Sequence, residues 1–206
     1  AYLVVSGSAP ATITSGNGQG VLELAGGWLD AHTGLRVDSN VLLSADSSID
    51  AANGVLLRGT VSGSGQLQKW GQAALNFTNV DNSQWTGGLS VQDGTVWVAG
   101  SNALGTGVSE FADGTTLGLF DGVLLNNAVY LAGEVGIEVS GSENATLANA
   151  SGASSAVLVK RDTGTLTLGG GTVGETRVEG GTLRVTGNAL NGGNVEIGSN
   201  ATFEID

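Results

Sequence analysis

The sequence contains no cysteine and no methionine, only one proline and one histidine, and few charged residues. The absence of cysteine excludes a disulfide framework and a thiolate metal site. With His32 as its one histidine, the chain also lacks the nitrogen ligands of a zinc centre. No apolar run approaches the ~20 residues of a membrane helix. We therefore expect no metal, no cofactor and no membrane-spanning helix.

The charge balance is strongly acidic. Seven Lys and Arg residues stand against 19 Asp and Glu residues, which gives a net charge of −12. Such a chain repels the phosphates of nucleic acids and the anionic headgroups of a membrane surface. We therefore expect no nucleic-acid partner, and we attribute the charge to the solubility of a surface-exposed protein.

Glycine is abundant, with 36 residues spaced between short apolar runs. A hydrophobic content of 40% and many β-branched residues distinguish the chain from a disordered glycine-rich linker. Regularly spaced glycines between short alternating segments indicate turns between strands. No segment shows the sustained i, i+3, i+4, i+7 apolar pattern of a helix. The sequence therefore predicts an all-β fold.

Most of the chain consists of two copies of one long unit. The similarity is carried by residues 91–100 (VQDGTVWVAG) with 178–187 (VEGGTLRVTG), and by residues 67–69 (LQK) with 158–160 (LVK). The offset is 91 residues for the upstream block and 87 for the downstream block, so the second copy is shorter between them. We place the long repeats at roughly 35–122 and 123–206, within one continuous β-helix fragment covering 1–206.

A shorter period of roughly 20 residues, in the range of solenoid repeats, lies inside the long unit. Val96 recurs one such period later as Leu117, and Leu183 recurs in the same way as Phe203. A propeller blade needs about 40 residues and tight hairpins, whereas the turns here are loose and rich in glycine. A coil of about 20 residues holds three short strands that stack on their equivalents in the next coil. The sequence therefore predicts a right-handed, single-stranded parallel β-helix, a solenoid of about ten coils.

Several segments of the first copy resemble the passenger-associated β-strand repeat of bacterial autotransporters, of the pertactin-like or adhesin type. They are residues 63–71 (GSGQLQKWG), 74–77 (ALNF), 85–91 (WTGGLSV) and 93–98 (DGTVWV). The second copy, residues 158–193, is similar but lacks the loop that holds Trp85. The resemblance covers about two thirds of the chain.

The resemblance implies a location on the surface of a Gram-negative bacterium, or secretion from it. Contact with the membrane would then be made only through a C-terminal β-barrel outside these residues. The implied function is structural or adhesive, through attachment to a host-cell surface protein or glycan, or through self-association with another copy. Such a chain would not be an enzyme. Two alternatives remain open: the stem of an enzymatic autotransporter, and a carbohydrate-active β-helix enzyme.

Carboxylates are the main enzymatic possibility, because β-helical polysaccharide lyases and hydrolases use clustered acidic residues. Asp93 and Asp113 lie one short period apart in similar Asp-Gly-Thr contexts, so they are expected to stack on adjacent coils. Asp46 and Asp50 raise the same question. Asp-Gly turns exposed to solvent are the simpler interpretation, and we expect His32 to be a solvated turn residue. No catalytic residue is therefore assigned.

Tryptophans are the candidate binding residues. Arg184 takes the place of Trp97 in the second copy while its neighbours stay apolar, so alternation predicts that Trp97 points outward. Trp70 aligns with Arg161, and Trp85 lies in the loop that the second copy lacks. We therefore expect Trp97, Trp85 and Trp70 to lie outside the core. Exposed indoles stack on sugar rings or anchor protein contacts, although they can also cover neighbouring side chains.

Overall fold

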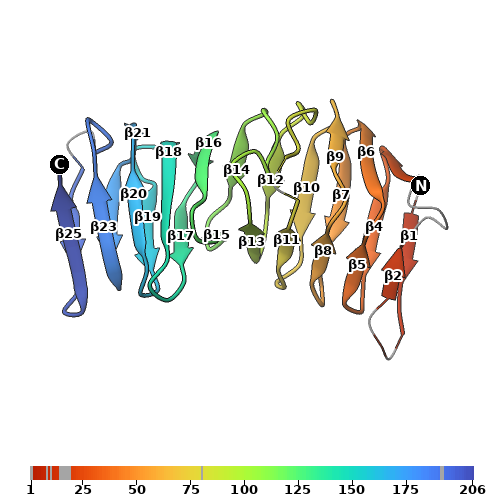
Figure 1. Cartoon of the computed structure of the whole chain (residues 1–206), viewed down its shortest axis with the longest axis horizontal. Coiled ribbons are helices and arrows are strands. Elements are labelled where there is room, and N and C mark those ends of the chain that lie inside the picture. The colour runs from red at the N-terminus through yellow and green to blue at the C-terminus, as the bar shows by residue number, and fades with distance from the viewer. Residues whose placement is uncertain (1, 8, 10, 14–19, 80, 191–192) are drawn as a thin grey trace.

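The structure is an elongated stack of short parallel strands with the two termini at opposite ends (Figure 1). This computed structural model describes residues 2–7, 9, 11–13, 20–79, 81–190 and 193–206. Within these residues there are strands and turns but no helix. The strands form a β-solenoid of about nine turns, with ~20 residues between stacked positions. The predicted all-β solenoid is therefore confirmed, with about nine turns where the sequence predicted about ten.

Each turn of the solenoid has three faces, which the chain visits in the same order. The first face contains β1 (Tyr2–Val5), β4 (Trp28–Ala31), β7 (Ser47–Asp50), β10 (Leu67–Trp70), β12 (Leu89–Val91), β14 (Ser109–Phe111) and β21 (Gly171–Thr172). The second face contains β2 (Ala11–Ile13), β5 (Leu35–Val37), β8 (Val55–Leu57), β11 (Leu75–Phe77), β13 (Thr95–Val98), β15 (Thr116–Leu119), β17 (Glu134–Val139), β19 (Val157–Arg161), β22 (Glu175–Val178) and β24 (Val195–Ile197). The third face contains β3 (Val21–Ala25), β6 (Asn40–Ala45), β9 (Val61–Gly63), β20 (Thr165–Leu168), β23 (Gly181–Val185) and β25 (Ala201–Ile205).

Two long strands run around a corner and connect the third face with the first. They are β16 (Leu124–Leu131) and β18 (Asn144–Gly152). The first half of β18 pairs with β20 and its second half with β21, and the register between β16 and β18 shifts at the corner. Isolated bridges, Gly63 with Trp85 and Asp81 with Asn102, connect the turns of the third face between β9 and β16.

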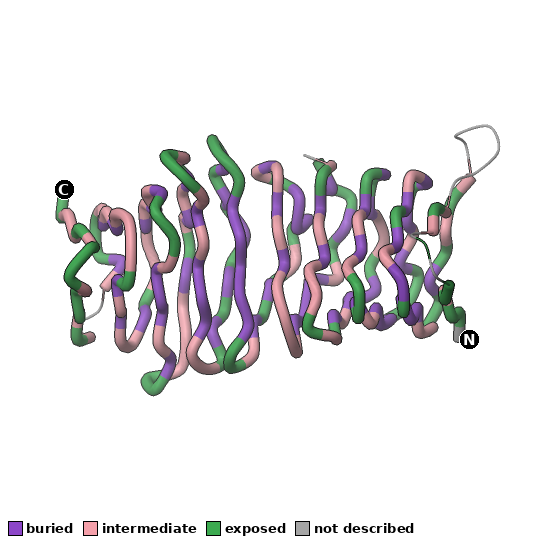
Figure 2. The backbone as a smooth tube through the Cα atoms, turned by 90° about the horizontal axis from the view of Figure 1, so that it is seen from below, coloured by how far each residue is buried: buried purple, intermediate pink, exposed green. Residues whose placement is uncertain are grey.

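The core is a set of columns of apolar side chains along the long axis. In one column of the second face, Val55, Leu75, Val96, Leu117 and Ile137 are successive partners. Each is buried, and in Figure 2 buried positions recur along the tube between its two end turns. Burying one such side chain contributes about 1.5–3 kcal/mol. Because inward residues alternate with outward ones along a strand, the core needs no long hydrophobic run.

The two sequence copies lie on different faces of the solenoid. β10 of the first copy is on the first face, whereas its counterpart β19 is on the second. β13 is on the second face, whereas its counterpart β23 continues the third. An offset of 87 to 91 residues corresponds to roughly four and one-third turns of ~20 residues. Equivalent residues of the two copies are therefore displaced by one face.

Candidate functional site

A stacked aromatic pair lies on the first face, with one ring exposed and the other partly buried. Trp70 is 37% exposed, and its ring stacks against Trp28 with a centroid distance of 6.3 Å and an interplanar angle of 26°. Trp28 in β4 pairs with Ser48 in β7, and Asp50, which is also in β7, pairs with Trp70 in β10. The two rings therefore belong to turns that are separated by one intervening turn. The sequence predicts the exposure of Trp70, but it does not single out Trp28.

Two carboxylates lie next to this pair. Asp30 and Asp50 are partners on successive turns of the first face, and Asp50 is followed in the same column by Trp70. The Asp30 carboxylate binds His32 Nε2 at 3.0 Å, and the imidazole is largely exposed. One oxygen of Asp50, Oδ1, is buried and has no hydrogen-bond partner. The solvated position predicted for His32 is confirmed.

A second aromatic contact lies on the second face. Trp97 points outward between the buried Val96 and Val98, as alternation predicts. Its ring lies over Gly118 of the next turn, where a Cβ would overlap the indole, and 5.2 Å from the ring centroid of the exposed Phe120. Gly118 thus provides the space in which the indole lies against the sheet. The role of Trp97 and Trp70 in binding stays a prediction.

The prediction for Trp85 is wrong. The residue is fully buried, and its ring stacks on the inward-facing Phe77 with a centroid distance of 5.9 Å. Its indole Nε1 donates to the carbonyl of Gly65 at 3.0 Å. The loop turns the tryptophan into the corner between two faces, where it fills the interior and cannot contact a partner. Trp85 is therefore a core residue.

The acidic residues considered for catalysis stabilise turns instead of forming one cluster. Asp93 accepts hydrogen bonds from Gln72 Nε2 at 2.6 Å and from the Gly94 amide. Asp113 accepts from the backbone amide of Glu134 at 2.7 Å. Both lie between the first and second faces on successive turns, as the sequence predicts.

Asp46 lies at a different corner. It is located between the third and first faces, and it accepts a hydrogen bond from the backbone N–H of Gln66 at 2.8 Å. It therefore does not share a site with Asp93 and Asp113. Within the part of the chain that the structure describes, no three His, Asp or Glu side chains are grouped so that they could hold a metal ion.

Two lysines lie inside the solenoid, a feature that sequence reasoning missed. Lys69 and Lys160 are equivalent in the two copies, and both have no exposed surface. The Lys69 ammonium donates to the carbonyl oxygens of Gly71 and Asp93, the latter at 2.6 Å. Lys69 lies between Ile49 and Val91 in an inward column, which alternation from Leu67 already indicates.

The same arrangement of carbonyls recurs in the second copy. Lys160 donates to Asp162 at 2.9 Å and to Gly180 at 3.3 Å, and these residues occupy the sequence positions of Gly71 and Asp93. The backbone is left-handed at both Gly71 (φ 81°) and Asp162 (φ 64°). An aspartate there carries a strain that glycine avoids. Each copy therefore uses a lysine to satisfy turn carbonyls of two successive turns.

Burial dominates the electrostatics of both lysines. It lowers the pKa of Lys69 from its ordinary value of 10.5 to about 8, while the carboxylates of Asp93 and Asp50 act in the opposite direction. Burial likewise lowers the pKa of Lys160 to about 8, against the opposite effects of Asp162 and Glu138. The charged form is therefore less favourable inside the solenoid than in water.

All five arginines form ion pairs. Arg36 and Arg58 share Asp38, with shortest distances of 2.7 and 3.5 Å, and Arg184 binds Glu204 at 2.8 Å. Arg161 and Arg177 belong to a network on the second face that contains Glu134, Glu175, Glu179 and Glu196. The hydrogen bond from Arg36 also holds the pKa of Asp38 below its usual value. With both lysines internal, no Lys or Arg side chain of the described residues is left unpaired at the surface.

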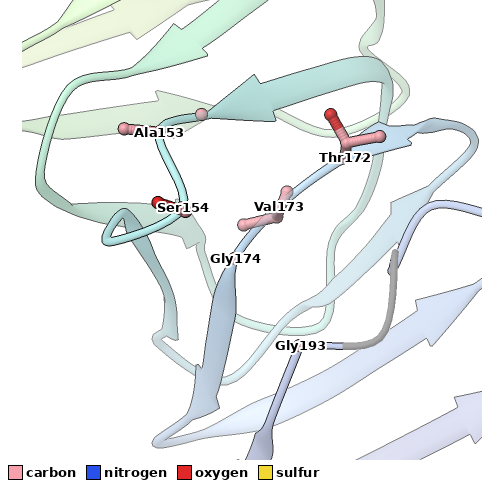
Figure 3. A pocket seen from close by; sticks show the side chains of 7 residues that line it. Ala153, Ser154, Thr172, Val173, Gly174 and Gly193 are labelled. Carbon is pink, nitrogen blue, oxygen red and sulfur yellow. The ribbon is translucent and has the colours of Figure 1, made fainter.

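An open notch of about 380 Å³ lies near the C-terminal end (Figure 3). It is lined by residues 152–154, 172–174 and Gly193, all small or apolar and none ionisable. Residues 172–174 lie where the second copy is shorter than the first, so the notch is at the counterpart of the segment that carries Trp85. Nothing in its lining provides an acid, a base or a nucleophile other than hydroxyl groups.

Comparison with protein-family models, with curated proteins and with solved structures finds no match for this chain. In the described segments, none of the secondary structure is a helix with the length and apolarity required to span a bilayer. The candidate site consists of the outer faces, which carry the aromatic pairs and the acidic side chains.

Proposed function

We propose that this chain is a structural and adhesive segment of a secreted bacterial passenger, and that it attaches to its partner through the outer faces of the solenoid. The observation that carries the proposal is the stacked pair on the first face, in which Trp70 is exposed and Trp28 is partly buried. Neighbouring apolar side chains on a surface often mark interaction sites, and tryptophan supplies much of the affinity at interfaces. Trp97 with Phe120 is a second contact point on the adjoining face.

The architecture suits such a role, because strands stacked in register give the solenoid a regular outer surface. Side chains that point outward from successive strands are ~4.8 Å apart along the axis. A partner would therefore contact a row of residues from several turns. The passenger assignment rests on the sequence resemblance, and the adhesive assignment rests on the exposed aromatic residues.

The test is attachment of coated beads to cultured host cells. Beads that carry the chain should attach more than beads that carry an unrelated acidic protein, and soluble chain should compete. The double variant Trp70→Ala/Trp97→Ala should attach several-fold less, while circular dichroism shows an unchanged fold. If the double variant attaches as well as the wild type, the adhesive role fails and a stem that only spaces other domains remains.

A further inference from the structure

The first face differs from the other two in its outward side chains. One outward column runs through Trp28, Ser48, Gln68, Ser90, Glu110 and Tyr130. A second runs through Asp30, Asp50 and Trp70. The described strands of this face contain one basic residue, Lys69, and its ammonium group is inside. The outside of the first face is therefore aromatic, acidic or neutral.

The carboxylates of this face favour a cation. Asp30 and Asp50 are partners on successive turns, but Asp30 is buried and already binds His32, so Asp50 is the carboxylate that is open to a further partner. Asp50 has a buried oxygen with no hydrogen-bond donor. The internal Lys69 offsets part of this negative charge, but its ammonium already binds turn carbonyls. Asp50 as a whole is only partly buried, so a donor that approaches from outside would meet the accessible side of this residue and not its buried oxygen.

The tryptophans favour the same kind of group. The face of an indole is the strongest cation–π acceptor among the side chains, and arginine is its commonest partner. Trp28 and Trp70 place two indoles beside Asp50, so that one guanidinium can both stack on a ring and donate to a carboxylate.

A second copy of the chain is a poor source for that cation. Each of its five arginines is paired with its own carboxylates, and both lysines are internal. The net charge of −12 adds repulsion between copies. An acidic glycan would be repelled for the same reason.

We infer that the first face docks a basic protein segment, whose arginine or lysine side chains lie against Trp28 and Trp70 and donate to Asp50. This inference rests on the proposed adhesive function and names the chemistry of the partner. Docking at this face has a defined position, because the aromatic pair is confined to the turns of β4 and β10.

The experiment measures binding of a fluorescent hexa-arginine peptide to the full chain. Trp28→Ala, Trp70→Ala and Asp50→Asn should each weaken binding about fivefold, as expected for an interaction of about 1 kcal/mol. Two controls lie off this face: Leu124→Ala removes an exposed apolar side chain at the start of β16, on the third face, and Asp121→Asn removes one charge. Both should stay within about twofold of the wild type, and thermal unfolding checks that every variant is folded.

Three outcomes would overturn the inference. Equal weakening by Asp50→Asn and Asp121→Asn with no effect of Trp70→Ala would mean that only net charge attracts the peptide. Binding of maltohexaose that depends on Trp70, without peptide binding, would make the face a platform for neutral glycans. Dimerisation that depends on Trp70 would make it a contact between copies. In the last two cases the beads can still attach to cells, so the adhesive function would stand while this inference fails. Peptide binding at this face without bead attachment would refute only the adhesive function.

Discussion

Raising the pH from 8 to 10.5 should stabilise the solenoid through its two internal lysines. In the folded chain the pKa of Lys69 and that of Lys160 are lowered to about 8, whereas the ordinary value is 10.5. Between these two values the unfolded chain binds protons that the folded chain has released. The free energy of unfolding therefore rises with pH in this window, and the cost of the buried charges is fully present below pH 8.

The magnitude follows from the size of the pKa change. One pKa unit corresponds to about 1.4 kcal/mol, so each lysine contributes up to about 3 kcal/mol across the window. This is an upper limit, because the growing negative charge of the chain acts against it at high pH. The neutral amine still donates to the carbonyls of Gly71 and Asp93, so the loss of the proton does not remove the contact.

The assay is urea unfolding, followed by circular dichroism at pH 7.5, 9 and 10.5. The single variants Lys69→Met and Lys160→Met should each lose about half of the rise in unfolding free energy, and the double variant should lose nearly all of it. The variants are compared by the slope of the unfolding free energy against pH. Its absolute value is not compared, because methionine leaves turn carbonyls without a donor and so changes the stability at every pH. An equal slope in the wild type and the double variant would mean that the two lysines do not cause the rise in stability with pH.

Three further predictions concern packing and buried hydrogen bonds. Trp85→Ala should lower the free energy of unfolding by about 4 kcal/mol, because it empties the space against Phe77, and urea unfolding measures the loss. Gly118→Ala should push the Trp97 indole away from the sheet, seen as stronger iodide quenching of its fluorescence with little loss of stability. Asn82→Ala should cost about 3 kcal/mol in the same unfolding assay, because this buried amide satisfies the Val61 amide and the Ala103 carbonyl at 2.8 and 2.7 Å.

Within the strands, the sequence predicts the structure closely. Val96 and Leu117 are partners in register, as are Leu183 and Phe203, at the spacings read from the sequence. Alternation also places Trp97 outside the core. These predictions succeed because the two-residue side-chain period and the apolar pattern jointly determine which residues face inward.

Outside the strands, the same reasoning does not apply. Trp85 lies in an irregular corner outside the strands, where it forms an isolated bridge to Gly63, so alternation cannot assign its direction. Its absence from the second copy suggests a surface loop, whereas the shorter copy instead has an open notch. Turn lengths also determine which face a strand joins, and sequence similarity alone does not reveal the displacement of the copies by one face.

Lys69 shows a different reason for failure. Its position alternates with Leu67, so the pattern indicates an inward side chain, but the general rule that charged residues are exposed argues against it. The buried lysine is tolerated because turn carbonyls accept the hydrogens of its ammonium group. One carbonyl belongs to Gly71, directly after β10, and the other to Asp93 in the next turn of the solenoid. A sequence without coordinates does not show where those carbonyls point.

The central functional claim is that contact is made by tryptophans on the outer faces and not by the buried one. Bead attachment should be compared for Trp70→Ala and Trp85→Phe, at a temperature at which circular dichroism shows both variants folded. We expect several-fold weaker attachment for Trp70→Ala and wild-type attachment for Trp85→Phe, which keeps an aromatic ring in the interior. Wild-type attachment by Trp70→Ala together with a clear loss for folded Trp85→Phe would contradict this claim.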